Sequence, residues 1–223
     1  MENFIKKVQD TFDNAKIFDS SSDDAIIPIN HHIDEKSKVL FVAGNNASGK
    51  SLVGKIIETI AADDKIPKRS CSMRNRTSGM FGQRLVFGDE SDNSTGQNSV
   101  NAVVKGLKST IETEGSLLIL DEPDLGLAEN YTAALGEYIA SQINEHNEKI
   151  GLIVIVSHSK ILFNCALETL KCPYSSVFVG DKNITFDDWL KSPLSKSSID
   201  ELLDLNRKSR ETWKRIQTFL ASE

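Results

Sequence analysis

The sequence has few of the features that mark secreted or membrane-inserted proteins. Its three cysteines are odd in number and lack Cys-x-x-Cys spacing, which suits a reducing compartment and offers no thiolate metal site. No stretch approaches the roughly 18 apolar residues of a membrane span. The first residues precede no long apolar run, so we expect no secretory signal. These absences predict a cytoplasmic protein without membrane insertion.

Neither the charge of the sequence nor internal repeats indicate a specialised class of protein. Charged residues make up 26% of the 223 residues and apolar residues 39%, as in ordinary globular chains. The net charge of −6 gives the whole molecule no long-range attraction to nucleic acid or to an anionic membrane. We find no internal repeat and no coiled-coil heptads. The length allows one full hydrophobic core.

The most informative segment that is present covers residues 38–51, with the sequence KVLFVAGNNASGKS. Its apolar part, Val39–Ala43, predicts a buried strand, and Leu52–Ala62 repeats apolar residues at helical spacing. Between them lies Gly-x4-Gly-Lys-Ser, the pattern of a phosphate-binding loop in its required strand–loop–helix context. Chance would produce the four fixed positions in about one chain of this length in a hundred. A glycine-rich turn before an ordinary helix is the alternative.

Each residue type of this loop has a physical role in binding a nucleoside triphosphate such as ATP. Gly44 and Gly49 allow the backbone to wrap closely around phosphate oxygens. Lys50 supplies a positive charge for the outer phosphates, and the Ser51 hydroxyl can ligate Mg²⁺. The predicted phosphate-binding residues are Gly44, Asn45, Asn46, Ala47, Ser48, Gly49, Lys50 and Ser51.

Hydrophobic periodicity predicts further strands and helices in alternation, and hence a mostly parallel sheet covered by helices. Further strands are predicted at 25–33, 116–120, 150–156 and 176–179, and further helices near 4–15, 94–113, 128–147 and 199–220. We expect the first helix to cover a sheet edge, with partner binding as the alternative. The last helix carries an apolar stripe that includes Trp213 and Ile216, which predicts core packing or, alternatively, a docking face.

Carboxylates and a histidine follow two of the predicted strands. Ligands of open α/β sheets lie beyond the carboxyl ends of the strands, so Asp121 is expected beside the glycine-rich loop, where it can hold Mg²⁺ opposite Ser51. Glu122 points elsewhere and can polarise the water that attacks the terminal phosphate. His158 can hydrogen-bond that phosphate and orient the water. A strand cap and a loop residue are the alternative interpretations.

Three segments together resemble the ATP-binding cassette (ABC) ATPases: GNNASGKS ending at Ser51, LDEP ending at Pro123, and VSH ending at His158. The resemblance covers residues 25–179. It implies an ABC-like P-loop NTPase fold, with Glu122 as the catalytic base and His158 as the switch histidine. It also implies that ATP is sandwiched between two copies of the domain.

The family's signature motif, typically Leu-Ser-Gly-Gly-Gln, has a partial counterpart at 93–97. Ser94, Gly96 and Gln97 match this motif, whereas Asn93 and Thr95 do not. The resemblance implies that the matching residues contact the ATP of a partner copy through a helix N-terminus, which suits anion binding. Ser94 can also be a helix cap, and the two roles are compatible.

The chain departs from the family pattern in several places. Only 43 residues separate Lys50 from Ser94, too few for the helical subdomain that grips membrane partners in transporters. After Pro123 the chain reads Asp-Leu-Gly-Leu-Ala rather than Ser-Ala-Leu-Asp. Gln83 is the one candidate for the Mg²⁺-sensing glutamine, and Phe18 is a candidate for stacking on adenine.

A basic segment from Lys65 to Arg84 has six basic residues and no acidic one. Clustered Lys and Arg suit contacts with nucleic acid phosphates, and the candidates are Lys68, Arg69, Arg74 and Arg76. Alternatively, Arg74 or Arg76 reaches ATP as an arginine finger. The third interpretation is a solvated loop paired with the acidic residues at 89–92.

Taken together, the sequence predicts an α/β protein with a helical C-terminal tail. We expect an N-terminal helix and loop at 1–24, an ABC-type ATP-binding domain at 25–185 and a helical segment at 186–223. The predicted activity is hydrolysis of Mg-ATP by a homodimer or a complex with a larger effector, in DNA maintenance or defence against mobile elements. A nucleotide-sensing switch with slow hydrolysis stays open as an alternative. So does the energy subunit of a transporter, which the short middle region disfavours.

Overall fold

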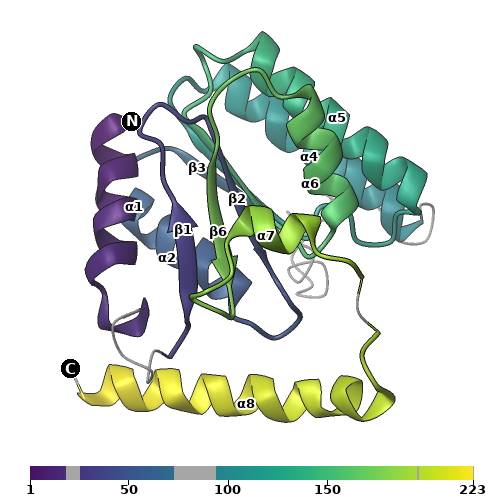
Figure 1. Cartoon of the computed structure of the whole chain (residues 1–223). Coiled ribbons are helices and arrows are strands. Elements are labelled where there is room, and N and C mark those ends of the chain that lie inside the picture. The colour runs from purple at the N-terminus through teal and green to yellow at the C-terminus, as the bar shows by residue number, and fades with distance from the viewer. Residues whose placement is uncertain (19–25, 73–93, 195, 223) are drawn as a thin grey trace.

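A mostly parallel β-sheet forms the centre of the molecule (Figure 1). The computed structural model describes residues 1–18, 26–72, 94–194 and 196–222. In these ranges six strands pair in the order β1-β6-β2-β5-β4-β3, and β1 alone runs antiparallel to its neighbour. The strands are β1 (Ile29–His32), β2 (Val39–Gly44), β3 (Lys68–Ser72), β4 (Leu117–Asp121), β5 (Leu152–Val156) and β6 (Ser175–Val179).

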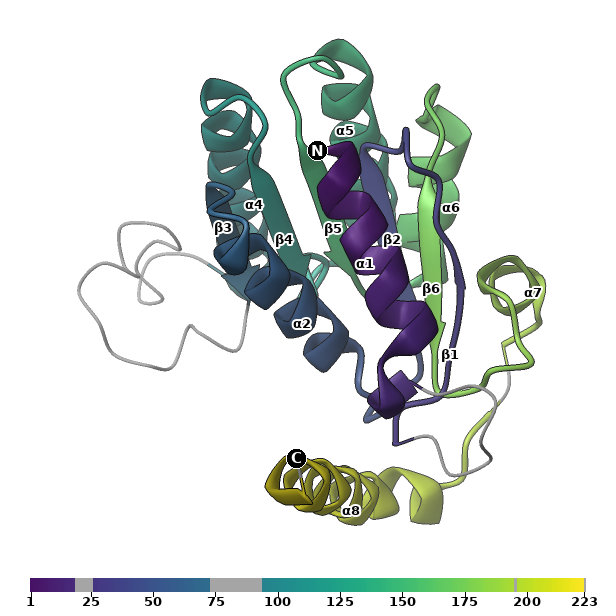
Figure 2. The same ribbon diagram turned by 90° about the vertical axis from the view of Figure 1, so that its left-hand side faces the viewer.

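Helices cover both faces of this sheet (Figures 1 and 2). They are α1 (Glu2–Asn14), α2 (Lys50–Asp63), α4 (Thr95–Glu112), α5 (Glu129–Glu145), α6 (Lys160–Thr169), α7 (Phe186–Lys191) and α8 (Ile199–Ser222), with a 3-10 turn η1 at Lys16–Phe18. One hydrophobic cluster joins a sheet face to α1 and α2, and a second joins the opposite face to α4, α5, α6 and α7. Within the described ranges, no helix is both long and apolar enough to span a membrane.

The central strands are apolar along their whole length because both of their faces are covered. All six residues of β2 are buried, with Leu40 and Val42 in the α1/α2 cluster and Phe41 and Ala43 in the opposite one. In the parallel registers, Val42 is opposite Val156, and Val156 is opposite Asp121. β2, β5 and β4 therefore end side by side, so that the loops which follow them meet at one edge of the sheet.

These observations confirm the predicted α/β class with a mostly parallel sheet flanked by helices, and they correct several details. The predicted strand at 25–33 begins only at Ile29, after Pro28, because proline cannot donate to a ladder. The sequence did not predict α6 or α7, and residues 68–72 of the basic segment form β3 rather than a loop. That edge strand exposes Lys68, Arg69 and Ser70 in succession, so it lacks an alternating pattern.

The first helix packs on one face of the sheet together with α2, and it contacts the edge strand β1, where the rings of Phe12 and His31 lie 5.5 Å apart. Its apolar side chains, among them Phe4, Val8 and Phe12, are buried in the same cluster as α2, which leaves them unavailable to a partner. An ion pair between Lys7 and Asp64 joins the two helices at the surface. The contact with β1 agrees with the predicted role at a sheet edge, and the burial of the apolar stripe disfavours the partner-binding alternative.

The C-terminal helix does not pack as its sequence predicts. Of its predicted stripe, Ile216 is buried in the α1/α2 cluster, but Trp213 is 55% exposed. α8 runs across the end of the sheet at which the parallel strands terminate (Figures 1 and 2). Only a narrow part of its surface therefore contributes to the core.

Candidate functional site

The glycine-rich loop (Gly44–Ser51) joins β2 to α2 along a path that glycine makes possible. Gly44 and Gly49 have φ angles of 152° and 104°, in the region that other residues rarely adopt. A Cβ atom on Gly44 would lie 2.3 Å from the Val179 carbonyl oxygen, because the loop passes directly against the end of β6. Gly49 is the N-cap of α2, and no side chain caps the first turn of this helix. A close backbone path and an uncapped helix start are features of anion-binding loops.

Two polar side chains of this loop fit an anionic ligand. Lys50 is only 6% exposed, and its Nζ donates a hydrogen bond to the Asn45 carbonyl oxygen at 2.7 Å. The Ser48 hydroxyl is buried and has no hydrogen-bond partner in the described part of the chain. A buried hydroxyl without a partner costs free energy unless a ligand satisfies it. A phosphate oxygen can accept from both groups.

Asp121 connects the loop to the carboxyl end of β4. The Ser51 hydroxyl donates to Asp121 Oδ1 at 3.3 Å, and the Ser72 hydroxyl at the end of β3 donates to Oδ2 at 3.1 Å. Two hydroxyls on neighbouring segments thus fix the orientation of one carboxylate. Hard oxygen donors of this kind are the ligands that Mg²⁺ prefers. The arrangement suits the Mg²⁺ site predicted at Ser51 and Asp121.

Sequence reasoning missed Ser72 in this group. It lies in the part of the basic segment for which no strand was predicted, so nothing indicated that its side chain sits at a strand end. Its pairing with Asp121 follows from the parallel register of β3 and β4, in which the two residues are opposite each other. The polar side chain of Ser72 was the one signal in the sequence, and it becomes informative only once β3 is known to end there.

Glu122 and His158 face each other across the ends of β4 and β5. The Glu122 carboxylate Oε1 lies 3.9 Å from His158 Nδ1, and both side chains are partly exposed. Glu122 has a φ of 54°, a left-handed conformation that is uncommon outside glycine, while its N–H donates to the Val156 carbonyl oxygen at 2.8 Å. The chain therefore turns sharply at Glu122, which presents its carboxylate to the histidine.

The loop that carries His158 is fixed to the loop that follows Glu122. The Ser157 hydroxyl donates to Asp124 Oδ1 at 2.9 Å and accepts from the Ser159 N–H at 3.0 Å. Ser159 in turn caps the N-terminus of α6. Hydrogen bonds of this type hold side chains in place at a site. They restrict how far His158 can move from Glu122.

The first turn of α4 is capped as the sequence predicts. The Ser94 hydroxyl accepts from the Gln97 N–H at 3.3 Å, and the Gln97 side chain accepts from the Ser94 N–H at 2.9 Å, forming a reciprocal capping box. The Ser99 hydroxyl donates to the Leu125 carbonyl oxygen at 2.8 Å. This contact attaches the start of α4 to the loop after Glu122.

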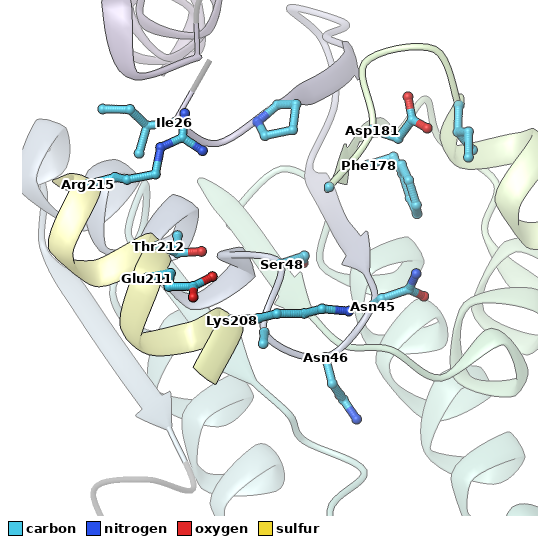
Figure 3. Close-up of a pocket in the computed structure, with 14 residues that line it drawn as sticks. Ile26, Asn45, Asn46, Ser48, Phe178, Asp181, Lys208, Glu211, Thr212 and Arg215 are labelled. Carbon is cyan, nitrogen blue, oxygen red and sulfur yellow. The ribbon is translucent and has the colours of Figure 1, made fainter. Parts of the chain in front are cut away.

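The structure does not bring Ser94, Gly96 and Gln97 to the glycine-rich loop of the same chain. They line a separate groove of about 990 Å³ between the N-terminal halves of α4 and α5, together with apolar side chains such as Val104 and Tyr131. The glycine-rich loop instead borders a cavity of about 540 Å³ (Figure 3). The two sets of residues are therefore on different surfaces of one molecule.

Several predicted residues lie elsewhere. Phe18, the candidate for stacking on adenine, is 1% exposed, packs edge-to-face on Phe12, and does not line the cavity beside the loop. Lys68 on β3 donates to the Glu58 carbonyl oxygen at 2.9 Å and lies 3.9 Å from the Glu58 carboxylate. Arg69 is exposed on the same strand. Three of the predicted residues fall outside the described ranges, namely Arg74, Arg76 and Gln83.

Neither a protein-family model nor a curated protein matches this chain. Functional inference therefore depends on the geometry of the described residues. At the carboxyl edge of the sheet, that geometry joins Ser51, Ser72 and Asp121 in one group and Glu122 with His158 in another, while Lys50 lies across the glycine-rich loop.

The close packing of α4 on the loop after Glu122 gives a first prediction. A Cβ atom on Gly96 would lie 2.6 Å from the Gly126 carbonyl oxygen, which cannot move without shifting the loop. Gly96→Ala should therefore lower the free energy of unfolding by about 1–3 kcal/mol, although alanine favours helix by about 1 kcal/mol. Urea denaturation measures this change.

Asn101→Ala on the exposed side of α4 is the matched control, because it also raises helix propensity, by somewhat less, without a clash. It should leave the free energy of unfolding unchanged or raise it slightly. Stabilisation of the Gly96→Ala protein to the same extent would contradict the close contact.

Proposed function

We propose that this chain is an ABC-type ATPase with a P-loop NTPase fold that binds and hydrolyses Mg-ATP. The observation that carries the proposal is the hydrogen bond of 3.3 Å between Ser51 and Asp121. It joins a glycine-rich loop with an orphan buried hydroxyl to a carboxylate at the end of a parallel strand. These are the two parts that a Mg-triphosphate needs at one place.

The proposed phosphate ligands belong to the glycine-rich loop. Its main chain and the Ser48 hydroxyl donate to phosphate oxygens, and the Lys50 ammonium, which has three donors, neutralises part of their charge. In the described structure the Lys50 Nζ already lies across the loop, bonded to Asn45 O. The cation is thus held where a bound anion would meet it.

Ser51 and Asp121 are the residues that would hold Mg²⁺. When bound, this ion neutralises charge on the outer phosphates and helps to orient the terminal one for displacement. The Ser72 hydroxyl supports the site indirectly, since it orients the Asp121 carboxylate. Such outer-shell partners commonly change metal affinity by about 10- to 100-fold.

Glu122 is the proposed general base. Its carboxylate accepts a proton from the attacking water, whose oxygen forms a bond to the terminal phosphorus as the bond to the bridging oxygen breaks, giving ADP and inorganic phosphate. His158, 3.9 Å from Glu122, positions the water or the terminal phosphate by hydrogen bonding. The turn at Glu122 and the Ser157–Asp124 bond hold this pair in place.

Assembly into a dimer completes the proposed site. Ser94, Gly96 and Gln97 lie on a different surface from the glycine-rich loop, so they act on the nucleotide of a second copy or of a larger effector. An N-terminus of a long helix such as α4 suits the terminal phosphate of that nucleotide. The proposed ATP sandwich therefore needs two chains.

DNA maintenance or defence against mobile elements is the proposed setting, based on the basic segment alone. Both cations of β3, Lys68 and Arg69, are exposed, but Lys68 is engaged with Glu58. The proposal of nucleic acid contact therefore depends chiefly on Arg69, Arg74 and Arg76.

The role of Glu122 generates the direct test of this function. Glu122→Gln removes the base but keeps the size and polarity of the side chain. We expect ATP binding to persist, hydrolysis to fall by about 10²-fold or more, and a dimer to accumulate with ATP. Steady-state phosphate release and light scattering with and without Mg-ATP measure these effects.

Glu168→Gln on the exposed side of α6 is the matched control and should hydrolyse ATP like the wild type. Hydrolysis by Glu122→Gln at the wild-type rate would remove Glu122 from its proposed role. Tight ATP binding by a wild-type protein with negligible turnover would instead favour the nucleotide-sensing switch.

The support of Asp121 by Ser72 is tested separately. Ser72→Ala removes one of the two hydroxyls on the carboxylate, so the Mg²⁺ concentration for half-maximal ATPase activity should rise about tenfold. Ser70→Ala, an exposed serine on the same strand, should leave it unchanged. Identical Mg²⁺ responses of the two variants would show that Ser72 has no such role.

A further inference from the structure

The helix α8 is a wall of the cavity beside the glycine-rich loop (Figure 3). Loop residues Asn45–Ser48 form one side of this cavity of about 540 Å³, and Asp181, in the segment after β6, contributes to another. From α8, Lys208, Thr212 and Arg215 line it, with Glu211 between them. The last helix of the chain thus meets the proposed phosphate-binding loop.

The side of α8 that borders the cavity is polar. Lys208, Thr212 and Arg215 follow each other at spacings of four and three residues, so they lie on one side of the helix, and Ile216 beside them is buried in the α1/α2 cluster. The opposite face carries exposed apolar side chains, among them Leu203 (70% exposed) and Trp213 (55% exposed). Polar and charged side chains on the cavity wall suit a polar or charged ligand in the cavity.

The α8 wall of the cavity carries two cations, Lys208 and Arg215, and one carboxylate, Glu211. The Glu211 carboxylate accepts from Arg207 Nη1 at 2.7 Å, and Arg207 also donates to Asp204. Lys208 lies 4.0 Å from Asp204, at the limit of an ion pair. Asp181 on the opposite wall balances the charge of the cavity lining, so that the positive charge is concentrated on the α8 side.

The Lys208 side chain points to the glycine-rich loop (Figure 3). It extends from α8 toward Asn45 and Asn46 of the glycine-rich loop (Figure 3). Arg215 lies two turns further along the helix, near Ile26. A nucleotide whose phosphates occupy the loop has its remaining part beside these two cations. Apolar residues of the same cavity, including Pro28 and Phe178, offer contacts to a base.

We propose that α8 is part of the nucleotide site, with Lys208 and Arg215 as binding residues for the phosphates or ribose of a nucleoside triphosphate held by the glycine-rich loop. The inference rests on the proposed function and extends it to a helix that none of the recognised motifs includes. It also gives the two cations on the cavity side of α8 a ligand.

Isothermal titration of Mg-ATP tests this inference with matched variants of one helix. Lys208→Ala and Arg215→Ala should each weaken ATP binding about tenfold, and the double variant should weaken it further, because charge-assisted hydrogen bonds are lost. Arg210→Ala and Lys214→Ala remove the same charge from exposed positions that do not line the cavity. These controls should bind ATP like the wild type.

The outcomes separate this inference from the proposed function. Wild-type protein that fails to bind ATP overturns both. If Lys50→Ala loses ATP binding while the α8 double variant binds ATP as tightly as the wild type, only the role of α8 is overturned. Equal weakening by all four single variants also overturns it, because a general charge effect then suffices. If the double variant has no cooperative unfolding transition and so is not folded, the Lys208→Gln and Arg215→Gln variants replace it. Their ATP affinities are then compared with those of the wild type and the controls in the same way.

Discussion

A contact between a hydroxyl and a carboxylate joins two segments of this chain that are far apart in sequence, and the candidate site depends on it. Ser51 Oγ lies 3.3 Å from Asp121 Oδ1 because β2, β5 and β4 end side by side in parallel register. A shift of one residue in either register would turn Asp121 to the other face of the sheet. The packing of the buried apolar strands thus determines where Ser51 and Asp121 lie. The position of the glycine-rich loop follows from the position of β2 in the core.

Hydrogen bonds between loops make this edge of the sheet a single unit. Ser157 binds Asp124, and Ser99 binds the carbonyl oxygen of Leu125, so the histidine loop and the first turn of α4 both hold the segment after Glu122. In the proposed dimer, a movement of α4 would therefore be transmitted to the Glu122–His158 pair through these contacts.

Much of the fold could be predicted from the sequence, because long apolar runs such as β2 and β4 leave no alternative to burial. The group of Lys50, Ser51 and Asp121 could be predicted for a related reason, since parallel strands end at a common edge. β3 could not, because an edge strand with exposed Lys68 and Arg69 shows no alternation, and Ser72 was missed with it. The place of α8 could not be predicted either. The charged residues that line the cavity, Lys208 and Arg215, have the sequence pattern of ordinary surface positions, and apolar residues such as Leu203 and Trp213 are exposed.

The Mg²⁺ dependence of ATP binding tests the central claim most directly, because it measures the proposed pairing of the loop with the end of β4. Titration calorimetry of the wild type and Asp121→Asn, each with Mg²⁺ and with a chelator, separates the contribution of the glycine-rich loop to ATP affinity from that of Mg²⁺ held by Asp121. The account predicts that Mg²⁺ tightens ATP binding to the wild type about tenfold or more and that Asp121→Asn loses this gain. An identical gain in both proteins, or no ATP binding by the wild type, would contradict it.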